Sequence, residues 1–171
     1  MPISAANLKW YLSGGAGNAD PNASLGGARS TTLVGAGLNN LFDDVTGDEA
    51  AAGFTDYVCI YFRNEDANAN GLLAPLKLWI DQQTTASGDD ISIGVDPAGK
   101  NAAATTIANE TTAPAGVVFS APLTKATGID LPGAPYAQND YVGVWIKRVV
   151  NVGAASDPND QASIRVEGDS V

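Results

Sequence analysis

Histidine is absent from the 171-residue chain, and cysteine and methionine occur once each. Without histidine the chain lacks the commonest general base, the commonest zinc ligand and every Ser-His or Cys-His nucleophile. The single cysteine, Cys59, excludes a disulfide within the chain, and its place in the apolar run 57–62 predicts a buried, unreactive thiol. We therefore expect no enzyme, no catalytic residue and no cofactor.

Long apolar runs and positive charge are also scarce. No stretch approaches the roughly 20 apolar residues of a membrane-spanning helix, and the first residues lack the basic start and apolar stretch of a signal peptide. The chain has 9 Lys and Arg residues and 19 Asp and Glu residues, which gives a net charge of −10. The cations are scattered along the sequence. Because such a chain is repelled by phosphate backbones and anionic lipids, we expect neither nucleic acid nor membrane as a partner.

Apolar and polar residues alternate at period two in several segments, which predicts strands with one buried face. The run 57–62 is apolar on both faces, as expected for a central strand covered by a second sheet or by loops on its outer side. Eight or nine strands are expected in all. The stronger candidates are 57–62, 76–81, 91–95, 142–147 and 162–167, and the weaker ones are 8–12, 31–34, 117–120 and 123–127.

Turn-rich stretches separate these strands, in keeping with 19 Gly and 9 Pro, and no βαβ alternation occurs. Short helical turns are expected at 38–45 and 48–52. The pattern predicts an all-β fold over residues 1–171, a single-domain antiparallel β-sandwich or Greek-key barrel with long Gly/Asn/Ala-rich loops. We expect residues 1–30 to form an extended arm or a loop, with 14–27 ordering on assembly.

One loop resembles a metal-binding motif. Asp66, Asn68 and Asn70, followed by Gly71, match the start of a calcium-binding EF-hand loop, but its twelfth position is Lys77 instead of a bidentate Glu. We expect a polar hairpin loop and keep these three residues as a weak cation candidate.

Acidic residues also cluster at Asp43, Asp44, Asp48 and Glu49. Two carboxylates suffice for glycoside hydrolysis if a cleft places them roughly 5–10 Å apart. Consecutive acids around a Thr-Gly pair are more typical of a solvated turn or a helix N-terminus, which is the interpretation we adopt.

Large aromatic residues are the candidate interface residues. Trp79 and Trp145 fall on the strand faces opposite those assigned to the core, so a partner is expected to cover them, and Trp10 and Tyr11 lie in a weaker strand candidate. The alternative is a sugar-stacking platform in a carbohydrate-binding module, with a glycan as partner.

Two N-terminal stretches, 8–27 and 40–47, resemble a family of small virion proteins encoded among the head and tail genes of tailed bacteriophages. The stretches 96–99, 104–122 and 143–148 resemble the same group, so the likeness covers most of the chain. The resemblance implies a structural subunit of the virion, made and folded in the host bacterial cytoplasm. The resemblance assigns no catalytic or cofactor-binding residue to this chain.

These observations together lead us to expect a capsid decoration or stabilising protein that binds by protein–protein contacts. Its partners would be further copies of itself and other virion proteins such as the major capsid protein. A ring component of the neck, collar, tail or baseplate is the alternative within the structural class.

Overall fold

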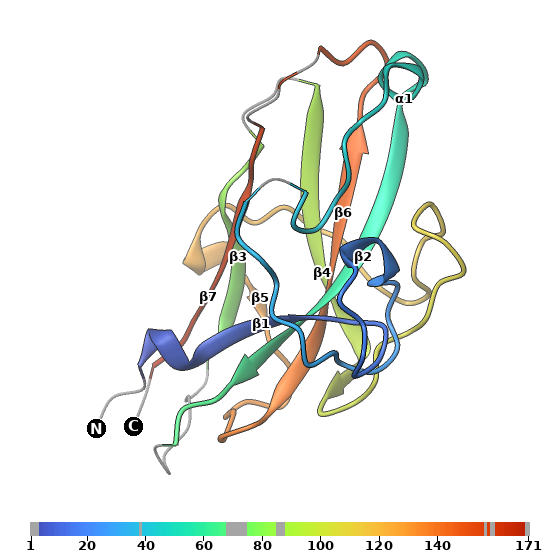
Figure 1. Cartoon of the computed structure of the whole chain (residues 1–171). Helices are drawn as coiled ribbons and strands as arrows, with labels where there is room; N and C mark the ends of the chain where they lie inside the picture. Colours follow the sequence, from blue (N-terminus) through green and yellow to red (C-terminus); the bar gives the residue numbers. More distant parts are fainter. Residues whose placement is uncertain are drawn as a thin grey trace.

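The computed structural model describes residues 4–37, 39–67, 75–84, 88–155, 157 and 160–169. In this part of the chain, seven strands form two antiparallel sheets, and the one α-helix, α1 (Gly47–Ala52), lies at one end of the molecule (Figure 1). The predicted all-β class and antiparallel pairing are confirmed.

The larger sheet has four strands in the order β1-β2-β6-β4. Their bounds are β1 (Leu8–Leu12), β2 (Phe54–Asn64), β6 (Tyr141–Val150) and β4 (Asp89–Lys100). The two central strands, β2 and β6, are the most apolar, because each is hydrogen-bonded on both edges and covered on both faces.

The smaller sheet has three strands in the order β5-β3-β7. They are β5 (Ile129–Asp130), β3 (Lys77–Gln82) and β7 (Ser163–Glu167). The burial of β7 alternates residue by residue, with Ile164 and Val166 turned toward the core. This is the pattern of a strand with one solvated face.

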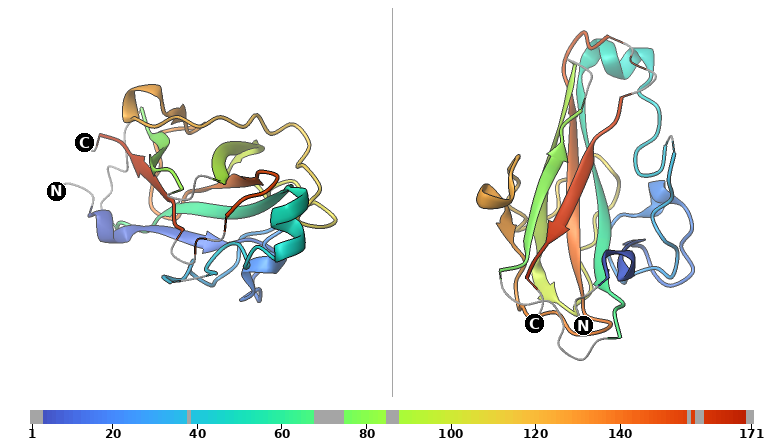
Figure 2. Two further views of the ribbon diagram at one scale, coloured as in Figure 1. Left: turned by 90° about the horizontal axis from the view of Figure 1, so that it is seen from above. Right: turned by 90° about the vertical axis from the view of Figure 1, so that its left-hand side faces the viewer.

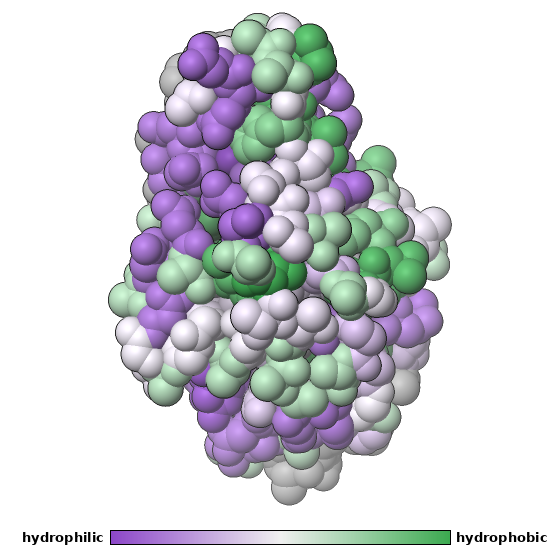
Figure 3. Space-filling model, turned by 90° about the vertical axis from the view of Figure 1, so that its right-hand side faces the viewer, coloured by the Kyte–Doolittle hydropathy of each residue, from purple (hydrophilic) through white to green (hydrophobic). Residues whose placement is uncertain are grey.

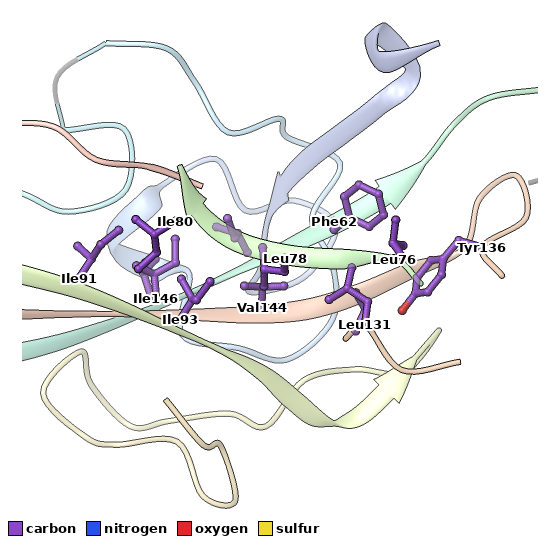
Figure 4. Packing of buried hydrophobic residues seen from close by; sticks show 13 residues of the cluster. Phe62, Leu76, Leu78, Ile80, Ile91, Ile93, Leu131, Tyr136, Val144 and Ile146 are labelled. Atoms are coloured by element: carbon purple, nitrogen blue, oxygen red, sulfur yellow. The ribbon is translucent and has the colours of Figure 1, made fainter. Parts of the chain in front are cut away.

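Both sheets contribute to one hydrophobic core. Figure 2 shows the arrangement of their strands from two further sides. Figure 4 shows Leu78 and Ile80 of β3 meeting Val144 and Ile146 of β6. The aromatic ring of Phe62 packs against Tyr136 with ring centroids 6.0 Å apart. The period-two alternation of the sequence therefore places its apolar residues as predicted.

A second apolar cluster covers the other face of the four-stranded sheet. Cys59 and Tyr61 of β2 and Trp145 of β6 lie there, packed by side chains from the long loops, including Leu25 and Ile107. The double-faced run 57–62 is thus a central strand covered by a sheet on one side and by loops on the other, as the sequence predicts.

Several local predictions are wrong. The segment 123–127 is not a strand, because Lys125–Thr127 forms a 3-10 turn whose N-cap, Thr124, accepts from the Thr127 N–H. Residues 31–34 and 117–120 pair with strands only at isolated bridges, Tyr11 with Leu33 and Ile93 with Ser120. Residues 39–45 form no helix, whereas the predicted helix at 48–52 is α1.

The N-terminal region forms a strand and a folded loop and does not extend as an arm. The strand is β1, and the loop that follows is closed by the Gly14 N–H donating to the Gly26 carbonyl at 2.8 Å. Ser13, Ser24 and Ser30 are buried in it. The shape of the loop is therefore held by hydrogen bonds within the chain.

Candidate interaction surface

Strand β1 is the element around which partly exposed apolar and basic side chains gather. Its Leu8 and Trp10 turn toward the core between the sheets, and Tyr11 turns toward the outer cluster. Beyond β1, the Val34 N–H donates to the Trp10 carbonyl at 2.9 Å, and the Leu12 N–H donates to the Thr32 carbonyl at 3.0 Å. The outer edge of β1 is thereby covered by the chain itself.

An apolar groove of about 390 Å³ runs beside β1. Leu8 and Trp10 line it from β1, Leu33 and Val34 from the neighbouring segment, and Ile164 from β7. Trp10 is half-buried, and its ring lies edge-on to Phe62 at 5.6 Å between centroids. The groove opens where the edges of the two sheets, β1 and β7, come together.

Three basic residues from distant segments meet on the outer face of β1 and β2. Lys9 is directly opposite Arg63 across the two strands. The guanidinium carbons of Arg29 and Arg63 lie 4.6 Å and 5.8 Å from the centre of the Tyr11 ring. We call Lys9, Arg29 and Arg63 the basic patch.

The charges of the basic patch are only partly neutralised. Arg63 forms an ion pair with Glu65 at 2.8 Å, and the Tyr11 hydroxyl donates to the same carboxylate. Burial and the neighbouring Glu65 raise the pKa of Tyr11. Within the described residues, Lys9 and Arg29 have no ion pair, and the Nε atoms of Arg29 and Arg63 have no hydrogen-bond acceptor. The basic patch therefore keeps positive charge that no carboxylate of the described residues pairs with.

The other end of β2 is acidic. Asp43, Asp44 and Asp48 are exposed beside α1, and Thr46 caps this helix in a capping box with Glu49. Figure 1 shows α1 at the opposite end of the molecule from the lower half that holds β1. The predicted helix N-terminus is confirmed, and its acids meet the positive end of the helix dipole.

Crowding of negative charge at this acidic end is reflected in the pKa of its less exposed carboxyl groups. Burial, together with Asp43 and Asp56, raises the pKa of Glu110. Burial and the neighbouring Asp160 raise the pKa of Asp89 to about 7. Both raised pKa values indicate a surface on which carboxylates outnumber the cations that could neutralise them.

Arg148 is the cation that neutralises part of the acidic end. Its guanidinium donates to both carboxylate oxygens of the buried Asp56, at 2.7 and 3.2 Å, and to the Asp43 carbonyl at 3.0 Å. The rings of Phe42 and Phe54 lie 4.6 and 5.4 Å from its guanidinium carbon. These contacts dock the 42–43 segment on the sheet, so the role of Arg148 is structural.

Two of the four predicted interface residues are covered within the chain. Trp145 is 0% exposed, packed beneath the loops, and its indole N–H donates to Asp96 at 2.9 Å. Trp79 is 5% exposed. The prediction that a partner must cover these two rings is therefore wrong, and they cannot form an exposed sugar-stacking platform. Of the other two, Tyr11 is 8% exposed beneath the basic patch, and Trp10 lines the groove.

The metal candidate is only partly described, since Asn68 and Asn70 lie outside the described residues. Asp66 is 2% exposed and accepts hydrogen bonds from the Ser4 N–H at 2.8 Å and the Asn7 amide at 3.0 Å. Its carboxylate ties the N-terminal turn to the end of β2. No group of three or more carboxylates and thiols close enough to hold a metal ion occurs among the described residues.

Cys59 is the remaining chemically reactive side chain that the sequence singles out. Cys59 is 0% exposed, and burial raises the pKa of its thiol, as expected for the unreactive cysteine that the sequence predicts. In the described part of the chain, no helix is long and apolar enough to cross a membrane.

The basic patch and the groove were missed by sequence reasoning. Lys9, Arg29 and Arg63 are far apart in the sequence, and only the pairing of β1 with β2 and the folding of the loop after β1 bring them together. Figure 3 views the side that carries the loop 101–120, where hydrophobic residues form separate small areas between hydrophilic ones.

No family model matches this chain, and no curated protein or solved structure is significantly similar to it.

Proposed function

We propose that this protein is a structural subunit of a bacteriophage particle, a β-sandwich that decorates or stabilises the capsid through protein–protein contacts. The observation that carries the proposal is the surface around β1, where an apolar groove adjoins a basic patch in a chain of net charge −10. Apolar grooves with polar rims are typical of protein contact sites. The resemblance of 8–27 and 143–148 to small virion proteins supplies the location.

The described functional groups favour binding over catalysis. The buried carboxylates Asp56, Asp66 and Asp96 already accept hydrogen bonds from the chain's own groups, which suits structural roles. Large exposed apolar side chains such as Leu123 and Val152 add surface that a neighbouring subunit could cover. A ring component of the neck or tail would use the same surface, and the position of the chain in the particle distinguishes the two.

The experiment is to purify particles of the encoding phage, identify their proteins by mass spectrometry and locate this chain by cryo-electron microscopy. We expect density for the chain on the outer capsid surface, with the groove beside β1 in contact with another protein. Density at the neck or tail would identify the chain as a ring component there and not as a capsid decoration protein. Absence of the chain from mature particles would contradict the proposal.

A matched pair of variants tests the groove itself. Leu33 lines the groove and is 46% exposed, so Leu33→Asp places a charge there without emptying the core. Val118, 81% exposed and outside the groove, supplies the control Val118→Asp. We expect Leu33→Asp to reduce co-sedimentation with particles that lack the chain, and Val118→Asp to bind like the wild type. Equal binding by both variants would remove the groove from the contact.

A further inference from the structure

The basic patch is unusual because the molecule around it is strongly acidic. Two copies with a net charge of −10 each repel one another over most of their surfaces. Repulsion turns into attraction only where a positive area of one copy meets a negative area of the next. Lys9 and Arg29, with no ion pair among the described residues, provide such a positive area.

The chain also carries the complementary surface. Asp44 and Asp48 are exposed beside α1 and have no hydrogen bond or ion pair with a side chain in the described part of the molecule. Acids near the basic patch differ, because Glu65 is paired with Arg63 and Asp140 with Lys100. Free negative charge is thus concentrated at one end of the molecule, and free positive charge lies on another part of it.

The two surfaces are too far apart to meet within one chain. Arg63 of the patch and Asp56, which contacts the acidic end through Arg148, are separated by seven residues along strand β2. At about 3.3 Å per residue this separation is roughly 23 Å, well beyond the Debye length of about 8 Å at physiological salt. Their charges can neutralise one another only between molecules.

We propose that the basic patch of Lys9, Arg29 and Arg63 binds the acidic end, Asp44 and Asp48, of a second copy of this chain. The contact is heterologous, patch to opposite end, so it propagates from copy to copy and closes into a ring when the rotation allows. The inference rests on the proposed function in one respect: it takes the chain to be a repeated subunit.

Carboxylates fit this patch better than a nucleic acid does. A phosphate backbone presents one charge about every 1.7 Å along a duplex and would extend beyond three cations onto acidic surface. Two carboxylates from a short turn and a helix start match a patch of this size. Tyr11 and Glu65 hold the arginines in place, so little side-chain freedom is lost on binding.

Charge reversal with exchange tests the contact. Lys9→Glu replaces one of the three cations of the patch by an anion, opposite Arg63, and Asp44→Lys with Asp48→Lys reverses the acidic end. Sedimentation velocity of the full chain is compared at about 0.1 M and about 1 M salt, where the Debye length falls from about 10 to about 3 Å. The wild type is expected to associate at low salt and to dissociate at high salt. Each reversed variant is expected to associate about tenfold more weakly.

Mixing the two variants should restore association, because the intact patch of the Asp44→Lys/Asp48→Lys variant then meets the intact acidic end of Lys9→Glu. The control is Lys125→Glu, which makes the same change in net charge at an exposed ion pair with Glu167. It should associate more strongly than Lys9→Glu. Circular dichroism of each variant checks that the fold is retained.

Three outcomes would overturn the inference: a wild type that stays monomeric at low salt, failure of the mixture to associate, or equal weakening by Lys125→Glu. These outcomes leave the proposed function intact if the chain is found in particles. Conversely, salt-sensitive association that is restored by mixing, in a chain absent from particles, would refute the proposed function alone.

Discussion

Tyr61 shows how a buried polar atom ties the long loops of this protein to its sheet. Its hydroxyl donates to the Gly27 carbonyl and accepts from the Ala104 N–H at 2.7 Å. The two loops also hydrogen-bond one another there, through Gly27 and Ala104. One side chain of β2 therefore fixes the crossing of two loops that cover the outer cluster.

Replacing Tyr61 by Phe should lower the free energy of unfolding by about 1 kcal/mol, because the Gly27 carbonyl and the Ala104 N–H each lose one hydrogen bond and keep the one between them. Tyr57→Phe is the matched control, since its half-buried ring packs on Phe119 and its hydroxyl has no hydrogen bond with the described residues. It should change stability by less than about 0.5 kcal/mol. Urea unfolding followed by tryptophan fluorescence measures both, and equal effects would contradict the role given to the Tyr61 hydroxyl.

Arg148 gives a second prediction at this scale. Arg148→Met removes the guanidinium that pairs with Asp56, a residue 1% exposed, and leaves a buried carboxylate without its counter-ion. We expect a loss of about 3–5 kcal/mol in the free energy of unfolding. Adding Asp56→Leu should recover part of that loss, because the unpaired charge is then gone. A double variant no more stable than the single one would show that the ion pair is not the source of the effect.

At the scale of elements, a pair of carboxyl groups links the start of β4 to the segment that leads into β7. Burial of Asp89, followed by its interaction with Asp160, raises the pKa of Asp89 from 3.8 to about 7. Two interacting carboxyl groups resist ionising together, so one of them keeps its proton to a higher pH.

The direction of the pKa shift of Asp89 determines how the stability of the fold depends on pH. Because the folded state holds the proton of Asp89 more tightly than the unfolded state, the contribution to stability is full below pH 3.8 and is lost as the pH rises through about 7. Asp89→Asn keeps an uncharged side chain, so it should flatten the fall in melting temperature between about pH 5 and about pH 8. Asp90→Asn, at the exposed neighbouring position, is the control. An unchanged profile in Asp89→Asn would refute the link.

At the scale of the whole molecule, two sheets share one core, so they should unfold together. Leu78 of β3 is 0% exposed in that core, and Leu78→Ala should cost about 2–5 kcal/mol. Leu123→Ala, at a position 58% exposed, should change stability by less than about 0.5 kcal/mol. Circular dichroism and tryptophan fluorescence should report one coincident transition. Separate transitions by the two probes would show that the sheets are independent units.

The sequence by itself determined the strongly alternating strands, the all-β class and the unreactive Cys59. Each of these depends on neighbours one or two residues away, since alternation along a strand decides which face a side chain occupies. It also placed α1, because acids such as Asp48 and Glu49 at the start of the segment 48–52 are typical of a helix N-terminus. The absence of histidine from the composition excluded catalysis and metal binding by histidine.

The tertiary structure decided which side chains reach the surface and which charges meet. Trp145 looked exposed because its strand alternates, but the loops that follow β1 and β4 cover it, and local alternation cannot show what a distant loop covers. Lys9, Arg29 and Arg63 form one patch only because strand register and loop hydrogen bonds bring distant segments together. Pairing between distant residues depends on the energy of the whole fold, so the groove and the basic patch beside β1 became visible only in three dimensions.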